Sequence, residues 1–228
     1  MSVLLFLSGS IIGSFLYCIS GSRDLLRRSR CDSCGHVLAP LDLIPILSFL
    51  FHKGRCRYCH EKISILYPLS ETVTGILFVL IYHRFGVSLS FPEYLILTVL
   101  LLSVSFCDLK TMRVPDLCLF LGIISRFLFS LIRKEDLLPS LTKAFFTAFL
   151  LYLLSALLSE VYRKQMMGIG DIRLVFLLSL YCEGYADVTA LLIASLCGLI
   201  AIVLCGQERI PFAPCLCFGY LLVYLYPG

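Results

Sequence analysis

Long apolar runs constrain this chain more than any other feature of its sequence. A helix that crosses a bilayer needs about 20 predominantly apolar residues, with about 17–25 as the working range. We predict up to eight such segments, at about Val3–Ser20, Ile65–Tyr82, Pro92–Cys107, Leu117–Ile132, Leu138–Ser159, Ile172–Tyr181, Val188–Cys205 and Phe212–Tyr226. Hydrophobic residues make up 59% of the chain and charged residues only 15%, which is far from a soluble balance. The sequence therefore predicts an all-α polytopic membrane protein with about eight transmembrane helices.

Basic residues predict the orientation of these helices. Four arginines directly follow the first apolar run, at Arg23, Arg27, Arg28 and Arg30. The positive-inside rule places such a cluster in the cytoplasm. If eight spans alternate from there, both termini lie outside. Asp108 then falls at the cytoplasmic end of the third span and Asp171 at the cytoplasmic start of the sixth, so the two acids lie at similar depth.

These two acids are the main catalytic candidates. A charged side chain at the centre of a membrane helix costs about 2.5–3.5 kcal/mol, so each acid requires either water or a function. Asp171 follows Gly168 and Gly170, whose missing side chains permit unusual backbone angles or a close approach of another segment. Two carboxylates that share one proton can activate a water molecule, as in aspartic proteases. We predict Asp108 and Asp171 to be this pair, with Gly168 and Gly170 supporting them.

Structural interpretations compete with this prediction. Asp116 directly precedes an apolar run and suits an N-terminal helix cap, and Asp171 could likewise cap the helix that it begins. Asp108 has no such explanation, because it follows an apolar run at a helix end where the dipole disfavours an anion. Asp116 is therefore the reserve candidate. Arg173 is expected either to tune the pair or to anchor the helix at the interface.

Two Cys-x-x-Cys pairs lie in the one sizeable polar segment, residues 21–64. They are Cys31 with Cys34 and Cys56 with Cys59, separated by about 20 residues. This spacing is typical of a tetrahedral zinc site with four thiolates, which has no open position and is therefore structural. Zinc would supply folding free energy to a segment too small for its own core. A thiol redox pair is the alternative, although it more typically has one such motif beside a βαβ unit.

Taken together, these motifs resemble the type IV prepilin peptidases, a branch of the GxGD membrane aspartyl proteases. The resemblance covers nearly the whole chain, in the family's order: Gly13-Ser14-Phe15-Leu16, the two Cys-x-x-Cys pairs, Asp42-Leu43-Ile44-Pro45-Ile46-Leu47-Ser48, Tyr67-Pro68-Leu69-Ser70-Glu71, Asp108 before Val114-Pro115-Asp116, Gly168-Ile169-Gly170-Asp171 and Pro211-Phe212-Ala213-Pro214. It implies an aspartic endopeptidase of the bacterial inner membrane, with both termini periplasmic. Its implied substrates are prepilins or pseudopilins of a pilus or type II secretion machine, cleaved at the cytoplasmic face, with no nucleic-acid partner.

A second activity follows from the same resemblance, namely N-methylation of the new N-terminus with S-adenosylmethionine. Gly54 and the four cysteines belong to the implied methyltransferase region, residues 21–64, between a first transmembrane helix at 1–20 and a peptidase domain at 65–228. Tyr17 stands where the family usually has asparagine, and no Tyr-Arg pair follows it directly, since Arg23 is the nearest basic residue. A peptidase without methyltransferase activity is therefore one alternative. A membrane scaffold that docks pilins through its zinc loop and cuts nothing is another.

Overall fold

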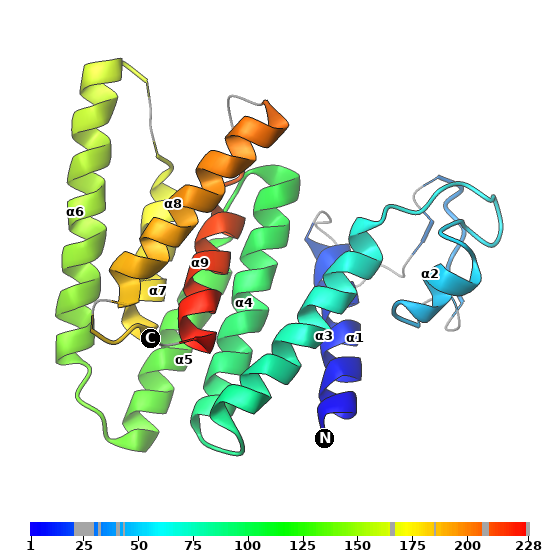
Figure 1. The fold of residues 1–228 in the computed structure, drawn as a ribbon, viewed down its shortest axis with the longest axis horizontal. Coiled ribbons are helices and arrows are strands. Elements are labelled where there is room, and N and C mark those ends of the chain that lie inside the picture. The colour runs from blue at the N-terminus through cyan, green and yellow to red at the C-terminus, as the bar shows by residue number, and fades with distance from the viewer. Residues whose placement is uncertain are drawn as a thin grey trace. The chain divides into compact units, whose positions relative to one another are not determined.

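The computed structural model describes residues 1–20, 30–31, 33–39, 42, 44–164, 167–184, 186–206 and 210–226. Arg23, Arg27 and Arg28, on which the predicted orientation depends, lie outside these residues. Within the described part, the chain forms nine helices and two isolated β-bridges, so the all-α prediction is confirmed. The chain divides into two compact units, residues 1–91 and residues 92–228 (Figure 1).

In the first unit, α1 (Ser2–Ile19) packs along α3 (Leu66–Phe85), and α2 (Leu47–Phe51) lies in the connection between them. Glycines allow this close packing. A Cβ added at Gly13 would lie 2.5 Å from Oγ1 of Thr74, and one at Gly75 would lie 2.8 Å from the ring of Phe6. Small residues at such a contact let two helix backbones approach closely, which strengthens dispersion contacts in a membrane.

The second unit consists of α4 (Ser90–Thr111), α5 (Asp116–Arg133), α6 (Leu138–Tyr162), α7 (Ile169–Tyr181), α8 (Ala186–Cys205) and α9 (Ala213–Leu225). The short helix α7 forms its core. It packs against α5, α6 and α9, and its residues from Leu174 to Tyr181 are buried except for Phe176. At 1.5 Å per residue, 13 residues extend about 20 Å, which is less than the roughly 30 Å of a hydrocarbon core.

Side chains from three helices hold the C-terminal end of α7. The last carbonyl oxygens of a helix lack intrahelical partners, so they need other donors. The pairs are Leu180 O with Nε of Arg126 from α5 at 3.2 Å, Tyr181 O with the hydroxyl of Tyr94 from α4 at 3.4 Å, and Cys182 O with Nζ of Lys143 from α6. These hydrogen bonds fix α7 at the end opposite Asp171.

The guanidinium of Arg126 is itself held by a buried acid. The side chain of Glu93 is fully buried and pairs with Arg126 at 3.1 Å and with Arg133. Glu135 pairs with the same two arginines, at 3.4 and 3.3 Å. Because a buried charge is tolerated only when it is paired, this four-residue cluster is a closed ionic network between the start of α4 and the end of α5.

Each of the eight predicted apolar segments lies on a helix. Of the nine described helices, five are long and apolar enough to cross a membrane, namely α1, α3, α4, α6 and α8. The other three helices that carry a predicted segment, α5, α7 and α9, have 18, 13 and 13 residues. The multi-pass prediction is thus confirmed, while the count of eight spans stays a prediction.

Candidate active site

Both predicted acids line one cavity of about 370 Å³ in the second unit. Its walls come from the end of α4, the α4–α5 connection and the start of α7. The lining residues are Asp108, Met112, Arg113, Val114, Asp116, Gly168, Ile169, Gly170, Asp171 and Arg173. All six residues that we predicted for peptide hydrolysis or its support are among them. The structure therefore brings together side chains from segments that are far apart in the sequence.

Asp108 lies near the end of α4, where its side chain is almost completely buried. Its Oδ2 accepts a hydrogen bond of 3.0 Å from the backbone N–H of Ala213, the first residue of α9. The N-terminus of a helix carries partial positive charge and unpaired N–H groups, so it favours a carboxylate there. The local sequence indicates only the unfavourable dipole of α4, because Ala213 lies 105 residues further along the chain.

The helix that carries Asp171 begins at Ile169, and its N-cap is Gly168, with no side-chain capping hydrogen bond. The alternative that Asp171 is a helix cap is therefore wrong. A Cβ added at Gly168 would lie 3.2 Å from Oδ2 of Asp171, and one at Gly170 would lie 3.1 Å from Cβ of Val114. The backbone of Gly168 has an ordinary φ of −74°. These two glycines are thus explained by close approach, and not by unusual backbone angles.

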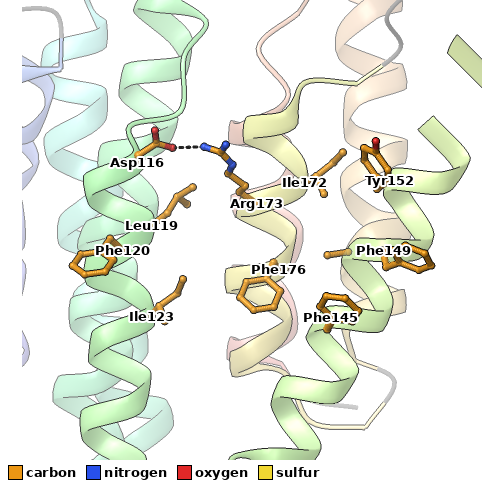
Figure 2. A pocket seen from close by; sticks show the side chains of 11 residues that line it. Asp116, Leu119, Phe120, Ile123, Phe145, Phe149, Tyr152, Ile172, Arg173 and Phe176 are labelled. Carbon is orange, nitrogen blue, oxygen red and sulfur yellow. Dashed lines mark hydrogen bonds and ion pairs between the residues drawn. The ribbon is translucent and has the colours of Figure 1, made fainter. Parts of the chain in front are cut away.

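Asp116 is also not a cap. Pro115 is the N-cap of α5, and Asp116 is the first helical residue, with no side-chain capping hydrogen bond. Its Oδ1 instead accepts a hydrogen bond of 2.9 Å from the guanidinium of Arg173 on α7, as Figure 2 shows. Both side chains are well exposed, so the pair itself contributes little, about 0–1 kcal/mol. Its effect is geometric, because it joins the N-terminal ends of α5 and α7.

The four predicted zinc ligands form a cluster in the first unit. The Sγ atoms of Cys31, Cys34, Cys56 and Cys59 all lie within 4.8 Å of one another, and those of Cys31 and Cys59 are 3.8 Å apart. A tetrahedral zinc ion with Zn–S bonds of about 2.3 Å would place its sulfur atoms about 3.8 Å apart. The arrangement of the thiols therefore fits a four-thiolate metal.

The two Cys-x-x-Cys turns have the same backbone geometry. The N–H of each first cysteine donates to the carbonyl five residues later, at 2.9 Å in Cys31 and 2.8 Å in Cys56. The N–H four residues later returns to that cysteine's carbonyl, from Gly35 at 2.9 Å and from His60 at 3.0 Å. Gly35 and His60 have φ of 68° and 58°, so His60 occupies a left-handed position that suits glycine.

A lowered thiol pKa accompanies this geometry. The backbone N–H groups of Cys34 and then Ser33 lower the pKa of the Cys31 thiol to about 7. Hydrogen bonds to the charged form are a recognised cause of such a shift. With this pKa, the Cys31 thiol loses its proton more readily than a free cysteine thiol. The thiolate is the form that binds metal.

Gly54 lies in a tight turn beside this cluster. Its φ is 70°, and a Cβ there would lie 2.9 Å from the ring of Phe49. Its N–H donates to the carbonyl of Phe49 at 2.8 Å, and its own carbonyl accepts from Ile63 at 2.8 Å. Both the backbone conformation and the Phe49 ring thus require glycine, which gives Gly54 a structural reason beside its implied role.

Two further acids of the first unit, Glu71 and Asp42, make contacts with the segment that connects α1 and α3. Oε2 of buried Glu71 accepts a hydrogen bond of 2.7 Å from the N–H of Ile46, whose φ of 61° is unusual for a β-branched residue. Oδ2 of Asp42 accepts from the N–H of Ala39 at 3.1 Å, and Oδ1 lies 3.5 Å from His52. Nothing local to either residue indicates these contacts.

Comparison with known proteins gives consistent matches. Residues 7–85 match the model described as "Bacterial Peptidase A24 N-terminal domain", and residues 95–203 match "Type IV leader peptidase family". A prepilin leader peptidase/N-methyltransferase of Bacillus subtilis (strain 168) is 34% identical over 241 residues, covering 99% of this chain and 94% of that protein. A type 4 prepilin-like proteins leader peptide-processing enzyme of Escherichia coli O78:H11 (strain H10407 / ETEC) is 34% identical over 207 residues, covering 85% and 74%.

A prepilin leader peptidase/N-methyltransferase of Myxococcus xanthus (strain DK1622) is 33% identical over 210 residues, covering 87% of this chain and 61% of that protein. No solved structure matches the chain. The matches to relatives extend over both compact units, since that of the Bacillus protein covers 99% of the chain.

Proposed function

The chain belongs to the type IV leader peptidase family and is a prepilin leader peptidase, and from this premise we propose that Asp108 and Asp171 are its catalytic dyad. The observation that carries the proposal is the cavity that both acids line, at the end of α4 and the start of α7. Neither acid has an ion-pairing partner among the described residues, in contrast with Asp116, Glu93 and Asp42. Two carboxylates that line one cavity and form no ion pair among the described residues are suited to proton transfer.

In this mechanism we assign Asp108 the role of general base, and the hydrogen bond from Ala213 orients its carboxylate. This hydrogen bond stabilises the ionised form of Asp108 and leaves Oδ1 for a water molecule. Asp108 takes a proton from that water while the water oxygen attacks the scissile carbonyl carbon, and Asp171 donates its proton to the carbonyl oxygen. The tetrahedral intermediate then collapses: Asp171 takes back a proton from one of its two hydroxyl groups as the carbonyl re-forms, the C–N bond breaks and the leaving amine takes a proton from Asp108. No covalent bond to the enzyme forms.

The dyad is tested by three matched substitutions, Asp108→Asn, Asp171→Asn and Asp116→Asn. Each removes one carboxylate from the same cavity and keeps the size of the side chain. We expect the first two to reduce cleavage of a prepilin at least about 10²-fold, since acid–base groups contribute 10²–10⁴-fold. Asp116→Asn breaks only the exposed ion pair with Arg173, so it should lower cleavage far less than either dyad variant. Full cleavage by either of the first two variants, at wild-type protein levels, removes that residue from the dyad.

Cleavage at the cytoplasmic face of the inner membrane, with both termini periplasmic, is a further part of the proposal. The basic residues Lys110, Arg113 and Arg173 accompany the two acids, which supports a cytoplasmic location for that end of the bundle. A fusion of alkaline phosphatase to the C-terminus checks this, because that enzyme forms its disulfides only outside the cytoplasm. We expect the alkaline phosphatase fusion to be active. If it is inactive, and a fluorescent cytoplasmic reporter fused at the same place is active, the orientation is the reverse of the one proposed.

We also propose that Cys31, Cys34, Cys56 and Cys59 hold a structural zinc ion and that the surrounding segment, with Gly54, serves N-methylation. The names of the relatives and the sulfur geometry support this proposal. S-adenosylmethionine would supply the methyl group. Gly54→Ala should then abolish transfer of labelled methyl to processed pilin while cleavage continues. Methylation by this variant at the wild-type rate would remove Gly54 from that activity and leave the peptidase proposal intact.

A further inference from the structure

A second cavity of about 530 Å³ lies in the same unit, between α5 and α6, with α7 as its floor. Figure 2 shows Leu119 and Ile123 of α5 on one side of Phe176 of α7 and Phe145 of α6 on the other. Its lining is apolar and largely aromatic apart from Asp116 and Arg173 at one end. We call it the α5–α6 groove.

The spacing of the lining residues shows that each long helix contributes one face. Those of α5 are Asp116, Leu119, Phe120 and Ile123, and those of α6 are Phe145, Ala148, Phe149 and Tyr152. Both sets follow the pattern i, i+3, i+4, i+7, which defines a single stripe along a helix. Two parallel stripes with a floor between them form the kind of groove that receives an apolar helix.

The groove is not filled by the protein's own side chains. Phe120 is 62% exposed and Phe145 is 66% exposed, and the ring of Phe145 stacks on Phe149 with 6.1 Å between centroids. On α6, Ala144 is the one residue classed as buried. Exposed apolar side chains are ordinary on a helix that faces lipid, so exposure alone does not identify what occupies the groove. The occupant is instead inferred from the cavity that Asp108 and Asp171 line, which adjoins the groove.

The groove continues into the cavity of the two acids. Asp116 and Arg173 line both, and their hydrogen bond of 2.9 Å spans the boundary. Arg173 lies two residues from Asp171 on α7. An apolar helix in the groove would therefore present its end at Asp116 and Arg173, next to the candidate dyad. The pair of Asp116 and Arg173 at the end of the apolar α5–α6 groove also matches the sequence of a prepilin, in which a polar leader is followed by an apolar helix.

We propose that the α5–α6 groove binds the apolar helix of the prepilin that directly follows the scissile bond, with its N-terminal end at Asp116 and Arg173. This inference rests on the proposed dyad, because the dyad determines which end of the groove meets the scissile bond. The groove holds the helix within the bilayer and leaves the peptide bond before it in the aqueous cavity. Lipid acyl chains are the competing occupant.

Site-specific photocrosslinking tests the occupant directly. The full-length protein carries p-benzoylphenylalanine in place of Phe149 or, as a control, in place of Leu154, which is also exposed on α6 but outside the groove. Both variants also carry Asp108→Asn and are irradiated in membranes that contain an uncleaved prepilin. We expect a prepilin adduct from position 149 and none from position 154. Adducts with lipid alone at position 149, or equal prepilin adducts at both positions, overturn the proposal.

A groove-filling variant provides a functional test. Ala148→Trp places a bulky side chain in the groove without altering Asp108 or Asp171, and Leu154→Trp is the matched control. We expect Ala148→Trp to raise KM for the whole prepilin about tenfold, equivalent to about 1.4 kcal/mol, and to leave cleavage of a short peptide around the scissile bond unchanged. Unchanged KM for the whole prepilin overturns the groove, whereas activity in the Asp108→Asn and Asp171→Asn variants overturns the dyad.

Discussion

The backbone N–H of Ala213 donates a hydrogen bond of 3.0 Å to Oδ2 of Asp108. An acid at the C-terminal end of α4 is thereby held by the N-terminal end of α9. The contact resolves the electrostatic problem of an anion at the negative end of its own helix, because the positive end of a second helix faces it. It also orients the carboxylate within the cavity that Asp171 shares.

This contact predicts different stabilities for two inactive variants. In Asp108→Asn the amide oxygen still accepts from Ala213, so the unfolding midpoint in detergent should stay near that of the wild type. In Asp108→Ala the buried N–H of Ala213 loses its partner, which costs about 1–3 kcal/mol. Thermal unfolding of both purified variants checks this. Equal midpoints for the two would show that the hydrogen bond contributes nothing to stability.

Gly170→Ala should impair cleavage by displacing α7. The added Cβ would lie 3.1 Å from Cβ and 3.2 Å from Cγ2 of Val114, so Val114 or the first turn of α7 has to give by a few tenths of an ångström, and we expect the movement to reach Asp171. Shifts of about 1 Å at a catalytic group can cost about 10²-fold. Val114→Gly removes both contacting atoms. In a double-mutant cycle measured on prepilin cleavage, we expect this change to restore activity to Gly170→Ala, and purely additive losses would contradict the steric explanation.

The ionic cluster around Glu93 should stabilise the protein far more than the pair of Asp116 with Arg173. Glu93→Ala leaves Arg126 and Arg133 without their buried partner, at 14% and 18% side-chain exposure, and removing one member of a buried pair costs about 3–5 kcal/mol. Arg173→Gln breaks an exposed pair and should cost no more than about 1 kcal/mol. Unfolding free energies of the two variants in the same detergent provide the comparison. A loss for Glu93→Ala as small as that for Arg173→Gln would mean that the cluster is screened by water.

Removal of one thiol should release the metal. Cys56 is the most buried of the four cysteines, and Cys56→Ser replaces a thiolate by a weaker ligand. We expect purified wild-type protein to contain one zinc per chain by elemental analysis and Cys56→Ser to contain little. Cys118→Ser, outside the cluster, is the control and should keep its zinc. Acidification should release zinc from the wild type as well, because protons compete with the metal for the thiolates.

His60→Gly should strengthen metal binding. His60 has a φ of 58°, at the position where the first Cys-x-x-Cys turn has Gly35 with a φ of 68°. A left-handed conformation costs a residue with a side chain about 1–2 kcal/mol, so glycine should raise zinc affinity roughly fivefold in a chelator competition. Gly35→Ala is the reciprocal variant and should weaken it. Weaker binding by His60→Gly would indicate that the imidazole itself contributes to the site.

Features that depend on residues close together in the chain were predictable. Apolar runs of sufficient length form helices wherever they occur, and all eight predicted segments lie on helices. The spacing of Cys31, Cys34, Cys56 and Cys59 is enough to predict a thiol cluster. Each Cys-x-x-Cys turn already holds two thiols close together, so only the two turns have to come into contact. The motif around Gly168 and Asp171 could be recognised for the same reason.

Other features depend on how distant helices pack. Helix capping, the competing interpretation of Asp116 and Asp171, is wrong for both, because their helices begin earlier, with Pro115 and Gly168 as N-caps. The partner of Arg173 is on α5, and the donor to Asp108 is the first residue of α9. By itself the sequence determined which segments are helical and which thiols cluster, since periodicity and short spacing are local. Only the tertiary structure decided which N–H or guanidinium each acid meets, because those partners approach through the packing of helices on α7.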